Sequence, residues 1–223
     1  TLTVSSANYN VMAGEPGRLI VTATDTTSVV GQAGFSFTVA VEDTFGNRIT
    51  VGDNKNITVS ATVSGTTAAI TAGRQVRAGD DGLATFSDLV ITGSVSDTIS
   101  VSFTVTYTRL SDNQVTTVSS SVSAITLTHG VAAAIEMTNS ATARSGIAFG
   151  SQPIVRINDA YGNLVTTGSQ STQTVRLAAT GATLSGAAAI SASGGIAAFT
   201  GISLEGLAGS KTLTAEVTSP ATF

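Results

Sequence analysis

The chain has 223 residues, a formal net charge of −4 and only 11% charged residues, among which there are two lysines. This sparse, slightly acidic charge argues against nucleic acid or an anionic membrane as a partner, because both require clustered Lys and Arg. The absence of cysteine excludes a disulfide scaffold, a thiolate metal site and a cysteine nucleophile. With 42% apolar residues and many Thr, Ser, Val and Gly, the composition is typical of a folded β-protein.

Alternation of apolar and polar residues predicts the strands of the first half of the chain. Phe35, Phe37, Val39 and Val41 fall on one face of an extended segment, as expected of a strand with one buried side. The strands predicted in this half are residues 18–25, 34–42, 56–63, 68–71, 84–86, 97–108 and 115–128.

The second half repeats this pattern with one strand fewer. Its predicted strands are residues 132–138, 152–157, 172–179, 182–185, 196–199 and 210–218. The first half ends in the long alternating segment 115–128, and the second half has no equivalent of it. No charged residue occurs between residues 177 and 204, but glycines interrupt this stretch, so we expect short strands there and no membrane span.

Two motifs indicate that the halves are copies. Residues 41–47 (VEDTFGN) recur as INDAYGN, 116 positions further on (from position 41 to position 157), and GLATF at residues 82–86 is matched by GIAAF at residues 195–199. The pattern predicts an all-β fold of two tandem immunoglobulin-like β-sandwiches, the second lacking its last strand. The predicted parts are an N-terminal strand segment at 1–17, a first domain at 18–130 and a second domain at 131–223.

These motifs resemble those of a known family. Asp-x-[Phe/Tyr]-Gly-Asn after an early strand, with Gly-x-Ala-x-Phe about forty residues later, is similar to the bacterial Ig-like repeats of invasins and giant adhesins, and to repeats of surface-layer proteins. The resemblance covers residues 18–218. It implies an extracellular or cell-surface location and a role in load bearing, spacing and self-association, and it implies little about any particular ligand.

The N-terminal segment resembles the last strand of the first copy. Residues 3–6 (TVSS) match residues 117–120 (TVSS), and both segments then reach a glycine, Gly17 and Gly130, before the next domain begins. Residues 1–10 are therefore expected to be a final strand without a domain of its own. The side chains expected to anchor it in a groove are Leu2, Val4, Tyr9, Val11 and Met12.

A free strand at one end and a missing strand at the other predict strand exchange between copies. An unpaired sheet edge recruits extended chains, so the N-terminal strand of one subunit would fill the groove of the next. Such head-to-tail contacts give a filament or a cell-surface lattice. The alternative is a stalk segment of a longer adhesin or surface-layer protein, and a carbohydrate-binding module comes third. An enzyme is not expected, because no nucleophile elbow, phosphate loop or carboxylate pair stands out.

The repeated turns offer the main candidate site. Asp43, with Asp53, Asp80 or Asp81, could supply oxygen ligands to calcium. The competing interpretation is local and explains both copies: the aspartate holds backbone amides of the turn, the glycine adopts positive φ and the asparagine tolerates it. The turn residues are Asp43, Gly46, Asn47, Asp159, Gly162 and Asn163. No other cofactor is expected.

Three further features of the sequence bear on function. Asn56 begins an Asn-Ile-Thr sequon, which matters only in an organism that glycosylates its surface proteins. The single histidine, His129, is expected to be a turn residue, because no carboxylate or nucleophile adjoins it in sequence. The aromatic side chains are expected to fill the cores, which leaves no platform for a sugar, and any cell-surface or host ligand is unknown. These aromatics are Phe35, Phe37, Phe86, Phe103, Tyr107, Phe149 and Phe199.

Overall fold

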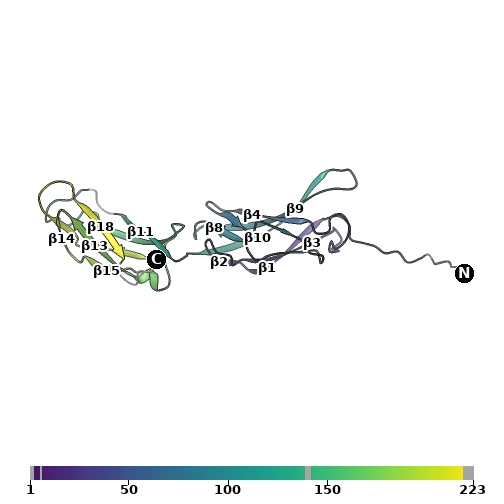
Figure 1. Cartoon of the computed structure of the whole chain (residues 1–223), viewed down its shortest axis with the longest axis horizontal. Coiled ribbons are helices and arrows are strands. Elements are labelled where there is room, and N and C mark those ends of the chain that lie inside the picture. The colour runs from purple at the N-terminus through teal and green to yellow at the C-terminus, as the bar shows by residue number, and fades with distance from the viewer. Residues whose placement is uncertain (1–2, 6, 139–141, 218–223) are drawn as a thin grey trace. The chain divides into compact units, whose positions relative to one another are not determined.

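The computed structural model describes residues 3–5, 7–138 and 142–217 of the chain. It is all-β, with facing sheets of the β-sandwich type, and divides into two compact units, Thr1–Thr128 (unit 1) and His129–Phe223 (unit 2) (Figure 1). Each unit is described by itself below.

Unit 1 is built from two main sheets. The first has the strand order β1 (Arg18–Asp25), β3 (Ser36–Glu42) and β7 (Leu83–Phe86). The second has the order β2 (Thr27–Val29), β10 (Val115–Thr128), β9 (Ile99–Thr108), β4 (Thr58–Ser64) and β6 (Gln75–Arg77). A further pair joins β5 (Ala69–Ala72) to β8 (Val90–Thr92).

The core of unit 1 is sealed by aromatic rings from both sheets. Phe103 packs between Phe37, at a centroid distance of 5.3 Å, and Phe86, at 5.0 Å, and all three side chains are fully buried. Phe35 is buried as well, which confirms that these aromatics fill the core. Tyr107 is half-buried, and its hydroxyl donates a hydrogen bond to the Pro16 carbonyl oxygen at 2.7 Å.

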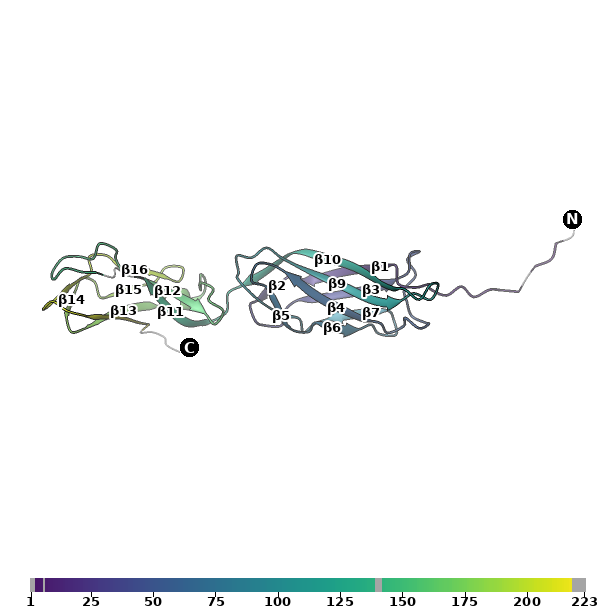
Figure 2. The same cartoon turned by 90° about the horizontal axis from the view of Figure 1, so that it is seen from above.

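The last strand of unit 1, β10, has two parts. Its first part pairs antiparallel with β9, from Val115 opposite Thr108 to Val122 opposite Val101. A register shift follows, where Ala124 adopts a φ of 62°. Beyond this bulge, Thr126 to Thr128 run parallel to β2, and Figure 2 shows the long β10 along one side of the unit beside β1. Ile125 and Leu127, on this second part, are buried in the core.

Unit 2 repeats most of this plan. One sheet has the order β11 (Ala132–Thr138), β12 (Ile154–Asp159) and β16 (Ile196–Ala198). Another has the order β15 (Ala189–Ser191), β13 (Thr174–Thr180) and β18 (Thr212–Val217), and β14 (Thr183–Ser185) pairs with β17 (Ser203–Glu205). A short 3-10 helix, η1 (Ser169–Thr172), precedes β13.

Strands β2 and β10 have no counterpart among the described strands of unit 2. Val101, Phe103 and Val105 of β9, the strand that pairs with β10, are buried in the core. The residues in the same places on β18, Leu213, Ala215 and Val217, are only half-buried. The described part of unit 2 therefore has the plan of unit 1 without strands equivalent to β2 and β10, and Phe149 and Phe199 are buried in its core.

The sequence predictions hold well for the long strands. Residues 18–25, 115–128 and 132–138 were placed correctly, and the other described ends fall within about two residues of the prediction. The short strands β2, β6, β8, β15 and β17 and the helix η1 were not predicted. The expected strand at residues 1–10 is not formed: among its described residues, 3–5 and 7–10 are outside any strand. Thr218 and Leu2 lie outside the described residues.

We expect Phe103→Ala to destabilise unit 1 by about 3–5 kcal/mol, because it removes the ring that two other phenylalanines contact and leaves a cavity. Phe45→Ala is the matched control, since the Phe45 side chain is 90% exposed. Guanidinium unfolding of the full chain, followed by circular dichroism, measures both. Equal midpoints for the two variants would contradict this account of the core.

Candidate functional site

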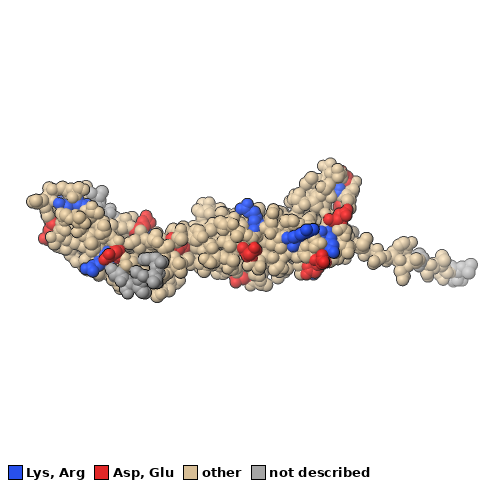
Figure 3. All heavy atoms as spheres, viewed as in Figure 1, with Lys and Arg blue, Asp and Glu red and all other residues tan. Residues whose placement is uncertain are grey.

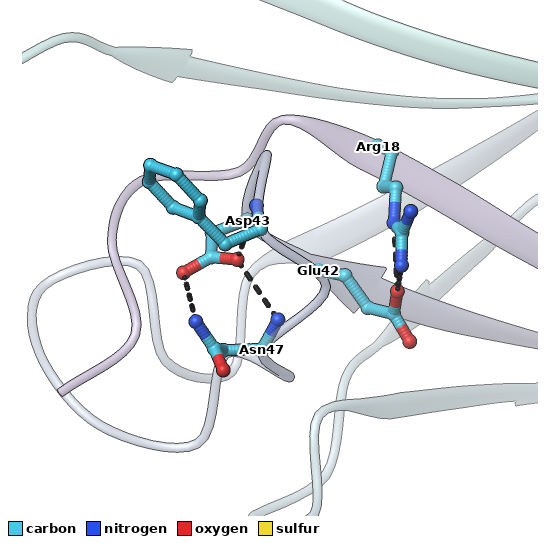
Figure 4. A network of polar contacts seen from close by, with 5 residues as sticks. Arg18, Glu42, Asp43 and Asn47 are labelled. Carbon is cyan, nitrogen blue, oxygen red and sulfur yellow. Dashed lines mark hydrogen bonds and ion pairs between the residues drawn. The ribbon is translucent and has the colours of Figure 1, made fainter.

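The carboxylate of Asp43 organises the turn after β3 (Figure 4). Its Oδ1 accepts hydrogen bonds from the backbone amides of Phe45 (2.9 Å) and Asn47 (2.8 Å). Its Oδ2 accepts from the Asn47 side-chain amide (2.9 Å) and from the Gly14 backbone amide (3.0 Å). Hydrogen bonds from Gly14 and the Asn47 side chain hold the pKa of the Asp43 carboxyl well below its usual range. The carboxylate thus ties the residues before β1 to the turn.

Asp159 makes the same set of contacts in unit 2. It accepts from the backbone amides of Tyr161 (2.8 Å) and Asn163 (2.9 Å), from the Asn163 side chain (3.3 Å) and from the Gly130 amide (2.8 Å). Burial raises the pKa of the Asp159 carboxyl, but the hydrogen bonds from Gly130 and its turn outweigh this and lower the pKa overall.

These two carboxylates establish which residues of the copies correspond. The Asp43 contact reaches back 29 residues to Gly14, and the Asp159 contact reaches back 29 residues to Gly130. Gly14 is therefore the counterpart of Gly130, and the sequence match that paired Gly17 with Gly130 was wrong. The error arose because Ser and Thr matches over four residues are weak evidence of register.

Gly46 of the first turn is required by its backbone and by its neighbour. Its φ is 90°, a region that side chains avoid, and a Cβ there would lie 2.5 Å from Nη2 of Arg18. That Nη2 forms an ion pair with Oε2 of Glu42 at 2.7 Å, beside the Asp43 turn. Gly162 has a φ of 82° at the same place in unit 2.

The acidic residues named as calcium candidates are not gathered around one point. Asp80 accepts from the Asn56 side chain and pairs with Lys55 Nζ, both at 3.2 Å, and these contacts lower its pKa. Asp81 accepts from the Leu83 amide (3.0 Å), and Asp53 is exposed. Within residues 3–5, 7–138 and 142–217, no cluster of three His, Asp or Glu side chains is placed to hold a metal ion. Both carboxylate oxygens of Asp43 accept hydrogen bonds from N–H groups. These donors stabilise the negative carboxylate and would repel a cation such as calcium.

Asn56 and His129 both serve local structure. Asn56, at a φ of 60°, uses its side-chain nitrogen to donate to the Ala78 carbonyl oxygen (2.9 Å) as well as to Asp80. A glycan on that nitrogen would disturb both contacts. His129 Nδ1 lies 2.8 Å from the Gly130 carbonyl oxygen, and its Nε2 lies 2.9 Å from Thr167 Oγ1.

The N-terminal segment is exposed up to a defined point. The exposed fractions are 97% for Val4, 83% for Tyr9, 89% for Val11 and 66% for Met12, which are unusual values for such side chains. Leu2 lies outside the described residues. From Gly14 onward the chain is held on unit 1 by Asp43, by the Tyr107 hydroxyl and by a hydrogen bond from the Gly17 amide to the Glu42 carbonyl oxygen (2.8 Å).

Unit 2 presents an open sheet edge and a pocket beside it. In Figure 1, β18 (yellow) runs beside β13, and among the described residues no strand pairs with its other edge. Near the start of β18 there is a pocket of about 570 Å³. Its lining includes Phe149, Leu204 and Leu213, with Lys211 and residues 142–145 at its margin. Sequence reasoning predicted a groove in unit 2 and named Phe149 as a core residue, but it did not identify this pocket.

The surface carries few charges, and three ion pairs in the described part of the chain join some of them. Figure 3 shows Lys and Arg in small separate groups on the visible face, several of them beside Asp or Glu. The ion pairs among the described residues are Arg18–Glu42, Lys55–Asp80 and Arg109–Asp112. None of the helices that the structure describes is long and apolar enough to cross a membrane.

Comparisons with known proteins give structural matches of low similarity. No protein-family model and no curated protein matches the chain. Similar solved structures include a Parabacteroides merdae β-glucuronidase with glycerol in its active site (9% identity, TM-score 0.30) and apo Bacteroides uniformis β-glucuronidase 3 (11% identity, TM-score 0.29). These matches cover 91% and 90% of this chain, whereas the chain spans 23% of the length of each enzyme. Likeness at this level carries no argument about activity.

We expect the stability of the protein to fall as the pH drops below about 4, because Asp43 and Asp159 have pKa values below their ordinary value of 3.8 in the folded state. A carboxyl group whose pKa is lower in the folded state than in the unfolded state stabilises the fold at pH values above the unfolded pKa. That stabilisation is lost as the pH falls and the carboxylates become protonated. Thermal unfolding of the full chain between about pH 5 and about pH 2 measures this loss.

In the same experiment, Asp43→Asn should be less stable than the wild type at pH 5 and less sensitive to acid. Asp53→Asn is the control, because Asp53 is an exposed aspartate for which the structure records no hydrogen bond. An Asp43→Asn variant that loses stability in acid as steeply as the wild type would contradict the role assigned to this carboxylate.

Proposed function

We propose that the chain is a non-enzymatic, extracellular structural subunit of two immunoglobulin-like β-sandwiches. Copies join head to tail when the N-terminal segment of one completes unit 2 of the next, which builds a filament or a cell-surface lattice. The observation that carries this proposal is a complementary pair of surfaces. One is the N-terminal segment, in which the large side chains of Val4, Tyr9, Val11 and Met12 are exposed, and the other is the edge of β18 that no described strand pairs with, beside a half-buried core face.

The open edge explains why a partner is needed. A strand with an unpaired edge offers a row of N–H and C=O groups to any extended chain. In unit 1 the corresponding edge, on β9, is covered along its length by β10. In unit 2 no described strand pairs with the same edge of β18, and the inward-facing side chains of β18 are half-buried. An added strand would satisfy the backbone groups and complete the core in one step.

The exposed segment has the composition that this site requires. Each apolar side chain of this size contributes about 1.5–3 kcal/mol when it becomes fully buried. Val4, Tyr9 and Val11 are almost wholly exposed in the single chain, so their burial is available to drive association. Because donor and acceptor are different surfaces of the same chain, the contact is heterologous and repeats without closing unless its rotation forms a ring.

The proposal includes no enzymatic role because the residues that could carry one are engaged in local contacts. The ring of His129 is engaged by Gly130 and Thr167, and the Asp43 and Asp159 carboxylates are occupied by N–H donors. An extracellular location rests on the resemblance of the repeated turn to Ig-like repeats of bacterial surface proteins. No metal or cofactor is part of the proposal.

A second candidate function is a stalk segment of a longer adhesin or surface-layer protein. The connection at Gly14 repeats the connection at Gly130, where one unit passes directly into the next. A run of such units in one chain would supply the strand for unit 2 from a following unit. In that case the same strand addition takes place within a chain, and the isolated 223 residues need not associate.

The assembly state of the purified chain separates these candidates. We expect the light-scattering mass of the wild type to rise with concentration, and a chain without residues 1–10 to remain monomeric. Val11→Asp should weaken association strongly, whereas Asn10→Asp adds the same charge on the opposite face and should change it little. If the wild type and the truncated chain are both monomers of equal stability, the self-assembly proposal is wrong and the stalk function is favoured.

A further inference from the structure

Unit 1 contains the completed version of the proposed contact. Its strand β10 first pairs antiparallel with β9, then makes a bulge at Ala124 with a φ of 62°, and then buries Ile125 and Leu127. The bulge changes the alternation, so that inward-facing side chains lie on the same side of the sheet before and after it. Any strand that replaces β10 must reproduce this change.

The N-terminal segment reproduces it when Gly14 is aligned with Gly130. In that register Val11 takes the place of Leu127 and Tyr9 that of Ile125, so both apolar residues fall on buried positions. Asn8 then takes the place of Ala124, at the one position that requires positive φ. Asparagine is the side chain, after glycine, that best tolerates this conformation.

The receiving strand can be aligned in the same way. Val63 of β4 lies opposite Val101 of β9, and the corresponding Ala179 of β13 lies opposite Leu213 of β18. Two residues further along these strands, Phe103 of β9 has Ala215 of β18 as its counterpart.

The sizes of the paired side chains fit this register. In unit 1 the large Phe103 lies opposite the small Ser120 of β10. In the contact between copies the small Ala215 would lie opposite Val4, which is larger than serine. The larger side chain at Val4 therefore offsets part of the volume that is lost where Ala215 stands in place of phenylalanine.

The pocket of unit 2 occupies the place of the second part of β10. In unit 1, β2 leads into a turn in which the Gly31 amide donates to the Ile91 carbonyl oxygen (3.0 Å). In unit 2 the Gly146 amide donates to the Leu204 carbonyl oxygen (2.9 Å), which makes residues 142–144 the counterpart of β2. These residues line the pocket together with Phe149, Leu204 and Leu213, so the end of a strand in the position of β10 would enter it.

From these observations we infer that residues 3–11 of a second copy bind along β18 in a single register, with Asn8 in a left-handed bulge and with Tyr9 and Val11 seated in the pocket near Phe149 and Leu204. The inference rests on the proposed function and adds the register and the receptor pocket to it. Val4 then faces Ala215, and Ser5 faces Thr214 on the outer side of the sheet.

Cysteine cross-linking tests the register, since the natural chain has no cysteine. A chain with Ser5→Cys is mixed with a chain with Thr214→Cys under mild oxidation, and the mixed disulfide dimer is measured by mass. Directly opposed residues of antiparallel strands lie about 4.5–5.5 Å apart at Cα, within the range of a disulfide. The control partner is Glu216→Cys, which belongs to the register shifted by two residues. We expect the Thr214→Cys dimer to predominate.

Two variants of Asn8 test the bulge without touching either unit. Asn8→Gly should associate as well as the wild type, because glycine accepts positive φ. Asn8→Val should lower the association constant by roughly 5- to 30-fold, because a left-handed backbone is costly for a β-branched residue. Neither glycine nor valine adds a charge that would complicate the comparison with the wild type. Light scattering measures the association of both variants.

The outcomes separate this inference from the proposed function. If the chain assembles but the Glu216→Cys dimer predominates, or if Asn8→Val assembles as well as Asn8→Gly, the register is wrong while head-to-tail assembly stands. If the chain assembles and neither cysteine pair forms a dimer, β18 is not the receiving edge and the inference fails. If the wild type does not assemble at all, the proposed function and the inference fall together.

Discussion

The interaction on which the rest of this structure depends is the aspartate carboxylate at the start of each repeated turn. In both units it accepts four hydrogen bonds, three from its own turn and one from a backbone amide 29 residues earlier in the chain. That long-range bond determines where the chain enters the sandwich. Because it is the same at Gly14 and Gly130, it also relates the N-terminal segment to the last strand of unit 1.

Much of the fold could be predicted from the sequence, because long strands with one buried face alternate regularly. The limits of β1, β10 and β11 were predicted correctly for this reason. Three-residue strands such as β2 and β6 contain too little of the pattern to be recognised. A structural role for the repeated Asp-x-x-Gly-Asn turn was one of the interpretations that the residues allowed, and three of the four hydrogen bonds of each aspartate lie within its turn.

The candidate site was less accessible to sequence reasoning. The phase of the repeat predicted that unit 2 has no strand equivalent to β10, and none is present among its described strands, but the register of the N-terminal segment could not be predicted in this way. It depends on a contact between Gly14 and Asp43, which no local pattern encodes. Nor could the Ala124 bulge be foreseen, because alanine is not a residue that signals positive φ. Simple alternation would place Val4 on the opposite face from Tyr9 and Val11, and a bulge at Asn8 like that at Ala124 would bring the three side chains onto one face.

The central claim is that the free edge of β18 receives a strand from another copy, and amide hydrogen exchange tests it most directly. In a dilute, monomeric sample, the amides of β18 that do not pair with β13 should exchange rapidly. In a concentrated, assembled sample, the account predicts slow exchange at residues 212–217, together with slow exchange across residues 3–11. Exchange at residues 212–217 that is equally fast in both samples, although the chain has assembled, would contradict it.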